Sequence, residues 1–233
     1  MISLHGAGVT VTLPASGATR TRVLLHPTSL DLQERRIAVV GANGSGKSTL
    51  LRLLNGLVLP SHGRVSVHGL DTRKQGRAVR RLVGFVFTDP LAQLVLATPA
   101  DDVELSLRSL VAGRSERRAE AIRLLGERGL ADLADQSVYD LSGGERQLVA
   151  LTSVLASQPR IVVADEPTTL LDLRNRDRVR VALAGLEQQV ILATHDLELA
   201  READRVLVID EGRVVADGPA EPAVAEYLRL VRA

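Results

Sequence analysis

The chain has 233 residues, 45% of them hydrophobic and 24% charged, which is enough for one large domain with a hydrophobic core. A net charge of +1 and an aromatic content of 2% argue against a nucleic-acid partner, because such a protein needs basic and stacking side chains. The absence of cysteine excludes disulfides and thiolate metal sites, and no apolar run reaches the roughly 18 residues of a membrane span or forms a signal-peptide core. We therefore expect a cytosolic protein that meets a membrane only through a partner.

The first third of the chain predicts strands, one glycine-rich turn and a helix. Weak alternation of apolar residues over 1–35 predicts short antiparallel strands around a turn at Pro14–Gly17. The apolar run 37–40 predicts a buried strand, and 50–57 predicts a helix. Further strands are predicted at 63–67 and 83–87, with Gly69 and Asp71 marking a turn between them.

From residue 88 to about 158 the pattern becomes helical. Apolar residues at i, i+3 and i+4 predict helices at 100–110, 115–125 and 143–156. The remainder alternates, with strands at 161–164 and 190–193, helices near 174–186, 197–203 and 220–231, and a hairpin of 206–210 with 213–216 through Glu211-Gly212. We expect an α/β fold with a mainly parallel sheet and antiparallel N-terminal strands. A single domain over 1–233 would have its core in 1–87 and 160–233 and an all-helical segment over about 88–159.

The stretch Gly41–Thr49 reads Gly-Ala-Asn-Gly-Ser-Gly-Lys-Ser-Thr and fits the phosphate-binding pattern G-x-x-x-x-G-K-[ST] between a strand and a helix. Glycines let successive N–H groups face one phosphate chain, and the helix adds the positive end of its dipole. Lys47 can reach the β- and γ-phosphates, and the Ser48 hydroxyl can hold Mg²⁺. An ordinary glycine turn is the alternative, but the pattern arises by chance in roughly 1 of 100 such chains. The predicted nucleotide-binding residues are Gly41, Asn43, Gly44, Ser45, Gly46, Lys47, Ser48 and Thr49.

A second anion site is predicted where the helix of 143–156 begins. Leu141–Glu145 reads Leu-Ser-Gly-Gly-Glu, in which Ser142 is a good N-cap. Gly143 and Gly144 expose the N–H groups of the first turn. Taken by itself, this stretch would be read as a capped helix.

The remaining candidate site residues follow the ends of two predicted strands. The apolar strand of 161–164 ends in Asp165 and Glu166, at the edge of a parallel sheet where ligands bind. Asp165 is suited to bind Mg²⁺, and Glu166 to polarise a water for attack on a γ-phosphate. The strand of 190–193 is followed by His195, which can donate to the γ-phosphate or orient the water. The alternative reading is that Asp165 and Glu166 are solvated acids at the end of a strand and that His195 has a structural role.

These motifs, in this order, resemble the ATP-binding-cassette ATPase family over nearly the whole chain. Gly41–Thr49 is similar to its Walker A loop and Leu141–Glu145 to its signature sequence. Asp165 and Glu166 match the Walker B Asp and the catalytic Glu. The stretch 168–172, which ends in Asp172, resembles the D-loop, and His195 resembles the switch histidine.

The resemblance implies hydrolysis of ATP to ADP and phosphate, with Mg²⁺ as cofactor and with Glu166 and His195 as catalytic residues. It also implies a head-to-tail dimer. Each ATP would lie between the Walker A loop of one subunit and Ser142, Gly143 and Gly144 of the other. The second subunit would be another copy of this chain or a sister ATPase.

A narrower resemblance is to the ATPases of energy-coupling-factor importers for vitamins and metals, most of all those for biotin. It lies in 54–57, 67–72, 83–87 and 166–175. It implies a peripheral place on the cytoplasmic face of the cell membrane, beside a transmembrane coupling protein and a substrate-binding membrane protein. The alternatives are the ATPase of another importer or exporter and a non-transport ATPase that acts as an assembly scaffold. DNA-maintenance relatives carry a long coiled-coil insertion, and translation-factor relatives carry two cassettes; this sequence has neither.

The chain departs from the family pattern at three places. Thr88 stands where the family has a glutamine that senses Mg²⁺ and the attacking water, so we expect a looser or differently built link to the coupling protein. Leu13 stands where an aromatic residue stacks on adenine, so we expect weaker stacking. Leu91 and Ala92 replace an acidic pair ahead of Gln93, the other coupling-loop residue. An arginine of the coupling protein would then need Asp89, or Asp101 and Asp102, as its partner. Neutral drift is the alternative in each case.

Overall fold

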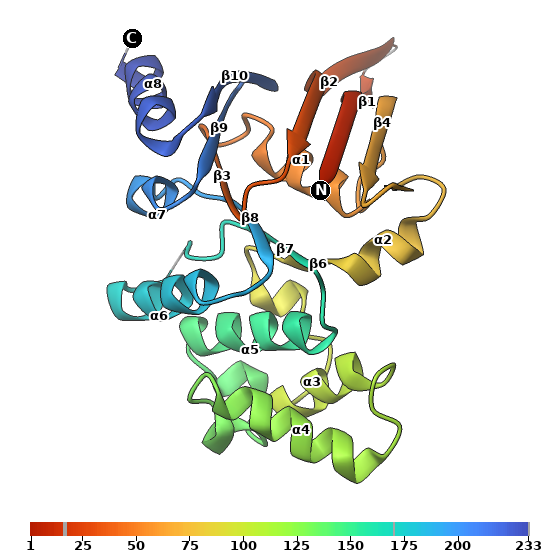
Figure 1. Cartoon of the computed structure of the whole chain (residues 1–233), viewed down its shortest axis with the longest axis vertical. Helices are drawn as coiled ribbons and strands as arrows, with labels where there is room; N and C mark the ends of the chain where they lie inside the picture. The colour runs from red at the N-terminus through yellow and green to blue at the C-terminus, as the bar shows by residue number, and fades with distance from the viewer. Residues whose placement is uncertain (16–17, 170, 233) are drawn as a thin grey trace. The chain divides into compact units, whose positions relative to one another are not determined.

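The computed structural model describes residues 1–15, 18–169 and 171–232 (Figure 1). They form two compact units, residues 1–83 with 189–233 and residues 84–188. Strands and helices alternate along the chain, which confirms the predicted α/β class. The predicted helical segment of about 88–159 within one domain stays a prediction. Ser16 and Gly17, in the predicted turn Pro14–Gly17, lie outside the described residues.

The first unit contains an antiparallel sheet with the strand order β2-β1-β4-β5. Its strands are β1 (Ile2–Ala15), β2 (Ala18–Leu32), β4 (His62–Val67) and β5 (Leu70–Asp71). The prediction of short N-terminal strands is wrong, because β1 and β2 have 14 and 15 residues. Register shifts between Leu4 and Thr10 interrupt their pairing, and such bulges break the alternation on which the prediction relied. The turn predicted around Gly69–Asp71 is tighter than expected, since Leu70 and Asp71 already form β5.

A second set of strands in this unit runs in the order β10-β9-β3-β8. These are β3 (Arg36–Val40), β8 (Gln189–Ala193), β9 (Arg205–Asp210) and β10 (Arg213–Gly218). The strand β3 is parallel to both β8 and β9, and the three are mostly buried, as their continuous apolar runs predict. The predicted hairpin of β9 and β10 is confirmed, and both of its turn residues, Glu211 and Gly212, have positive φ.

The described part of the first unit also contains the helices α1 (Lys47–Leu54), α2 (Gly76–Leu82), α7 (Leu197–Arg201) and α8 (Ala220–Arg232). The helix α1 buries Leu50, Leu51, Leu53 and Leu54 completely, which fixes the position of its N-terminus. The helix α2 was not predicted, because it has only seven residues and Val79 is its one buried residue, so it shows no apolar period.

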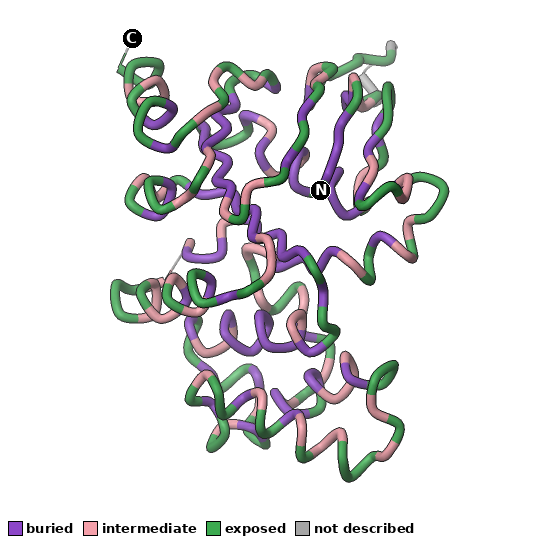
Figure 2. Tube along the Cα trace, in the orientation of Figure 1, coloured by how far each residue is buried: buried purple, intermediate pink, exposed green. Residues whose placement is uncertain are grey.

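The second unit holds most of β6 (Val83–Val86), which lies beside β7 (Ile161–Asp165). Its helices are α3 (Pro99–Leu107), α4 (Arg114–Gly126), α5 (Gly143–Ala156) and α6 (Leu173–Ala184), with short 3₁₀ turns at Pro90–Ala92, Ala131–Leu133 and Val138–Asp140. The helix α5 has the predicted bounds and is largely buried (Figure 2), because α3, α4 and α6 all contact it. Across the described ranges, no helix combines the length and the apolar character that a membrane crossing requires.

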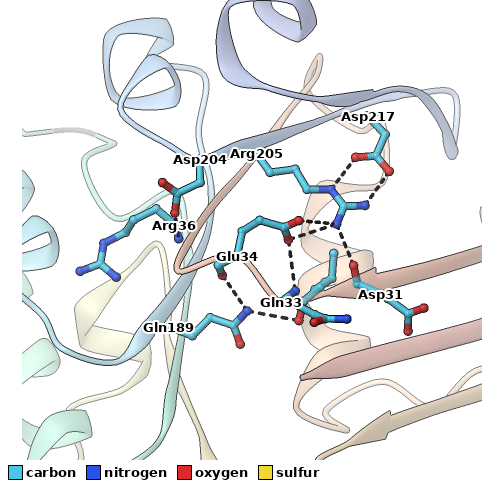
Figure 3. A network of polar contacts seen from close by, with 9 residues as sticks. Asp31, Gln33, Glu34, Arg36, Gln189, Asp204, Arg205 and Asp217 are labelled. Carbon is cyan, nitrogen blue, oxygen red and sulfur yellow. Dashed lines mark hydrogen bonds and ion pairs between the residues drawn. The ribbon is translucent and has the colours of Figure 1, made fainter.

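Arg205 links four segments of the first unit (Figure 3). Its Nε and Nη2 donate to the Asp217 carboxylate over 2.6 and 2.7 Å, and its Nη1 donates to the Asp31 carbonyl over 2.7 Å and to Glu34 over 3.1 Å. Burial raises the pKa of Glu34, but hydrogen bonds from its own N–H, from Arg205 and from the Gln33 N–H outweigh burial and leave that pKa below its ordinary value.

We expect Arg205→Ala to lower the free energy of unfolding at pH 7 by about 2 kcal/mol, since it removes charged hydrogen bonds from a guanidinium that is 17% exposed. A carboxyl whose folded pKa is lowered stabilises the fold above its ordinary pKa and loses that effect as the pH falls through the folded value. The loss should therefore shrink below about pH 4. Urea unfolding at pH 7 and at lower pH tests this. Arg229→Ala, which breaks an exposed pair with Glu226, is the control; an equal loss in both variants would contradict the assignment.

Candidate functional site

The loop Gly41–Gly46 curls around the side chain of Lys47 at the start of α1. Lys47 is 4% exposed, and its Nζ donates to the carbonyls of Gly41 and Ala42 over 2.9 and 3.1 Å. Gly46, at the N-cap of α1, has φ 115°, and a Cβ there would lie 2.8 Å from the Leu24 carbonyl oxygen. The loop thus places a buried ammonium next to the first N–H groups of a helix, which is a cradle for a polyphosphate.

The tip of the β9–β10 hairpin is hydrogen-bonded to this loop. The N–H of Gly212 donates to the Ser45 carbonyl over 2.7 Å, and the Gly212 carbonyl accepts from the N–H of His26 over 2.8 Å. A Cβ on Gly41 would come within 2.2 Å of the Ile209 carbonyl oxygen and 2.6 Å of Ser45 Oγ. The loop therefore leaves no room for a side chain at its first glycine.

Gly41→Ala should cost about 3 kcal/mol of unfolding free energy, because Ile209 lies in a paired strand and cannot retreat. Gly44→Ala is the matched control: φ is 78° there, but nothing lies within 4 Å of the added Cβ, so only about 1 kcal/mol of backbone strain is expected. Chemical denaturation without nucleotide measures both variants. Equal stabilities of the two variants would show that the close approach of the Ile209 carbonyl to Gly41 does not constrain the loop.

His195 lies at the same sheet edge as the glycine loop. The strands β3 and β8 are parallel, and the N–H of Thr194 donates to the Val39 carbonyl over 3.0 Å. The loop after β3 and the connection after β8 therefore start side by side. His195 is exposed in that connection, and Asp196 ends it by capping α7. Of the remaining predicted residues of the loop, Asn43 and Gly44 lie in the turn, and Ser48 and Thr49 lie in the first turn of α1.

In the second unit, Asp165 is the last residue of the fully buried strand β7, and Glu166 follows it. Asp165 is 1% exposed, and Glu166 has φ 49°, a left-handed conformation that is uncommon outside glycine. Thr169 Oγ1 donates to Glu166 Oε2 over 3.0 Å, and Thr88 Oγ1 donates to the Asp165 carbonyl over 2.7 Å. Sequence reasoning missed Thr169; a hydroxyl residue three positions after the acid was the available signal.

The start of α5 is a capping box. The N–H of Ser142 donates to Glu145 over 2.8 Å, and the N–H of Glu145 donates back to Ser142 Oγ over 3.3 Å. Hydrogen bonds from the side chain and the N–H of Ser142, together with the positive charge of Arg178, lower the pKa of Glu145, which therefore stays ionised at neutral pH. The first-turn N–H groups at Gly143 and Gly144 have no intrahelical partners, as at every helix start.

The starts of α5 and α6 lie against each other. A Cβ on Gly144 would lie 2.3 Å from Asn175 Cγ, and the N–H of Asn175 donates to Asp172 over 2.8 Å at the N-cap of α6. The structure thus brings Ser142 and Gly144 close to Asp172, three residues predicted for nucleotide binding and the D-loop. Leu170, in the same predicted loop, lies outside the described residues.

The coupling-loop residues have different surroundings. Gln93 Nε2 donates to the Ala150 carbonyl of α5 over 3.0 Å, and Gln93 Oε1 accepts from the N–H of Phe87 over 3.1 Å. Asp102 is buried and accepts two main-chain N–H groups, at Val95 and Leu96. Asp101 pairs with Arg118, so both of these carboxylates are already engaged. Asp89 remains exposed as the candidate partner for an arginine, although it also caps the 3₁₀ turn that follows.

A metal at this site would depend on phosphate oxygens as well as on the protein. Within the described ranges, no group of three or more His, Asp or Glu side chains is arranged to hold a metal ion. One carboxylate, one hydroxyl and phosphate oxygens are the donor set of nucleotide-bound Mg²⁺, which the chemistry of Asp165 and Ser48 fits. Ser48 belongs to the first unit and Asp165 to the second, and their joint ligation stays a prediction.

Comparison with known proteins agrees with these motifs. The family model described as ABC transporter matches residues 25–169. A biotin transport ATP-binding protein of Rhizobium etli is 46% identical over 209 residues, covering 90% of this chain and 93% of that protein. An energy-coupling factor transporter ATP-binding protein of Bacillus subtilis is 39% identical over 217 residues, covering 91% of this chain and 77% of that protein.

Among solved structures, a dimeric ATP-binding cassette in a post-hydrolysis state, bound to ADP and Pi, superimposes with a TM-score of 0.84. It is 28% identical, and the match covers 95% of this chain and 99% of that one. The fold and the relatives agree over nine-tenths or more of the sequence, and the family model agrees over residues 25–169. The chain belongs to the ABC transporter family, of which it is an ATP-binding and ATP-hydrolysing subunit.

Proposed function

We propose that this chain is the ATPase subunit of an energy-coupling-factor importer and that it energises the uptake of biotin or of another vitamin or metal ion. The 46% identity to a biotin transport ATP-binding protein over nine-tenths of both chains carries the proposal. The similarity to an energy-coupling factor transporter ATP-binding protein supports the importer type. The location that follows is peripheral, on the cytoplasmic face of the cell membrane, beside a transmembrane coupling protein and a substrate-binding membrane protein.

The chemistry proposed for the site is attack of a water on the γ-phosphorus of ATP. The water oxygen bonds to phosphorus, the bond to the β–γ bridging oxygen breaks, and ADP leaves with the electron pair. The carboxylate of Glu166 takes the proton of the water, and His195 orients the water or donates to the γ-phosphate. Lys47 and the N-terminus of α1 hold the triphosphate. Mg²⁺, bound by Ser48 and Asp165, would neutralise charge on the phosphates.

Each ATP is proposed to lie between two subunits, in contact with the glycine loop of one and the start of α5 in the other. A γ-phosphate carries enough charge to satisfy N–H groups at both helix starts. ATP would then close the dimer, and hydrolysis would loosen it. The dimeric state of the solved relative bound to ADP and Pi supports this arrangement.

Affinity purification of the tagged chain from detergent-solubilised membranes tests the transport role. The expected result is co-purification of two membrane proteins, a coupling protein and a substrate-binding protein, with ATP hydrolysis in the complex. Recovery of one pair of identical membrane subunits would favour an exporter or another ABC importer. Recovery with soluble assembly proteins and no membrane protein would favour the scaffold alternative.

A further inference from the structure

Thr88 contacts the main chain directly ahead of Glu166. Its Oγ1 donates to the carbonyl oxygen of Asp165 over 2.7 Å, within the second unit. Asp165 is the last residue of β7, and Thr88 lies two residues beyond the end of β6, the neighbouring strand. The hydrogen bond therefore joins the polypeptide at the ends of two adjacent strands.

The carbonyl that accepts this bond belongs to the peptide group between Asp165 and Glu166. The orientation of that peptide plane defines φ of Glu166, which is 49°. A non-glycine residue keeps such a conformation only when its surroundings impose it. Thr88 restrains the peptide group on the N-terminal side of Glu166, and Thr169 contacts Glu166 from the C-terminal side. The N–H of Thr169 donates to the Glu166 carbonyl over 3.2 Å, and its Oγ1 donates to Glu166 Oε2 over 3.0 Å. Two threonine hydroxyls thus restrain the backbone and the carboxylate of one glutamate.

Thr88 is itself held in place through its neighbour Phe87. The N–H of Phe87 donates to Gln93 Oε1 over 3.1 Å, and the Phe87 carbonyl accepts from Gln147 Nε2 over 3.3 Å. Gln147 lies on α5, and Gln93 donates to the Ala150 carbonyl of the same helix. Both main-chain groups of Phe87 are therefore tied to α5, directly or through one side chain, so the Thr88 hydroxyl is presented from a fixed segment.

We propose that Thr88 is a positioning residue of the ATPase: its hydroxyl fixes the Asp165–Glu166 peptide and so aims the Glu166 carboxylate at the attacking water. The proposal rests on the proposed role of Glu166 as the base. In this role Thr88 acts on Glu166 through the main chain of β7 and needs no contact with metal or water. Gln93 then serves to anchor the segment of Phe87 and Thr88 to α5. A small hydroxyl side chain suits this task, because the donor must reach a carbonyl within the same unit.

Steady-state ATP hydrolysis by the full chain tests the proposal with Thr88→Val and Thr88→Ser. Valine keeps the shape of threonine and removes the donor, so kcat should fall about tenfold while KM for ATP stays within twofold, because misaiming a base affects the transition state alone. Serine keeps the donor and should restore kcat to within about twofold of the parent value. Thr152→Val is the matched control, since it removes another threonine hydroxyl that donates to a main-chain carbonyl, that of Leu148, in the same unit; its kcat should stay within twofold.

A double-mutant cycle separates positioning from general destabilisation. Thr88→Val and Thr169→Val should combine to less than the product of their separate effects on kcat, because both act through Glu166. In a Glu166→Gln background, Thr88→Val should change the residual rate by less than twofold. If Thr88→Val does not fold, Thr88→Ala removes the same donor and is read in the same way.

The proposal is overturned if kcat of Thr88→Val stays within twofold of the parent, if KM rises in step with the fall in kcat, or if Thr88→Ser is impaired as much as Thr88→Val. Failure of the proposed hydrolytic chemistry, in which Glu166 is the base, gives a different result. In that case Glu166→Gln itself would hydrolyse ATP at the parent rate, whatever residue occupies position 88.

Discussion

Glu166→Gln should lower the rate of ATP hydrolysis by about a hundredfold or more, while ATP binding is kept. The amide has the shape of the carboxylate and can still accept the hydrogen bond from Thr169, but it cannot take a proton from water. Since hydrolysis is the step that opens the proposed dimer, the variant should also hold ATP in a closed dimer. Turnover assays and light scattering on a sizing column, with ATP and magnesium, measure the two effects.

Glu211→Gln is the control for this change. Glu211 is also a glutamate with positive φ, 44°, but it is exposed in the β9–β10 turn. The same substitution there should leave turnover within twofold of the parent. Hydrolysis at the parent rate in Glu166→Gln would mean that another group accepts the proton.

Lys47→Ala should weaken ATP binding by about thirtyfold, which corresponds to about 2 kcal/mol for charged hydrogen bonds to phosphate. Lys47 is buried with its ammonium against the Gly41 carbonyl, and residues 41–49 contain no other cationic side chain that could replace it. The free energy of unfolding without nucleotide should change little. The substitution removes the hydrogen bonds of the ammonium to Gly41 and Ala42, but it also removes the cost of burying the charge. Calorimetric titration with ATP and thermal unfolding without it separate the two quantities.

Lys74→Ala is the control, since Lys74 is the only other lysine in the sequence and is exposed. It should bind ATP with the parent affinity. Lys47→Arg should not keep the parent affinity, because a planar guanidinium on a longer side chain cannot take the place of the compact ammonium beside the Gly41 and Ala42 carbonyls. An affinity of Lys47→Ala within threefold of the parent would contradict the role given to this residue.

The sequence predicted those elements in which an apolar period and an end signal coincide. The helix α5 begins at Gly143 and ends at Ala156 as expected, because Ser142 caps a long amphipathic run. The buried strands β3, β7 and β8 also lie where their apolar runs predict them. The helix α2 gave no such signal, since it buries Val79 and little else. The length of β1 was underestimated because bulges reset its alternation.

The candidate site follows the same rule. The glycine loop, the start of α5 and the end of β7 could be placed from the sequence, because each has a local signal: a strand–turn–helix motif, a capping serine and an apolar run that ends in two acids. What the sequence could not show were contacts between segments distant in the chain. The hydrogen bond from Thr88 to the Asp165 carbonyl spans 77 residues, and the contact of Gly144 with Asn175 joins two helices. The positive φ of Glu166 has no local sequence signal either, because glutamate rarely adopts it.

The sharing of each ATP between two subunits is tested most directly by mixing two defective variants. Both carry Glu166→Gln, so that bound ATP is retained; one adds Lys47→Ala and the other adds Gly143→Asp. An acidic residue in the first turn of α5 suits the helix dipole but repels phosphate. A Cβ on Gly143 would lie 3.4 Å from Leu171 Cδ2, an ordinary contact.

Neither variant by itself should retain ATP on a desalting column. In a mixed dimer, one site combines both defects, and the other combines an intact glycine loop with an intact α5. We expect the mixture to retain ATP, close to one molecule per mixed dimer. A mixture that retains no more ATP than the separate variants would contradict the sharing of each ATP between two copies of this chain.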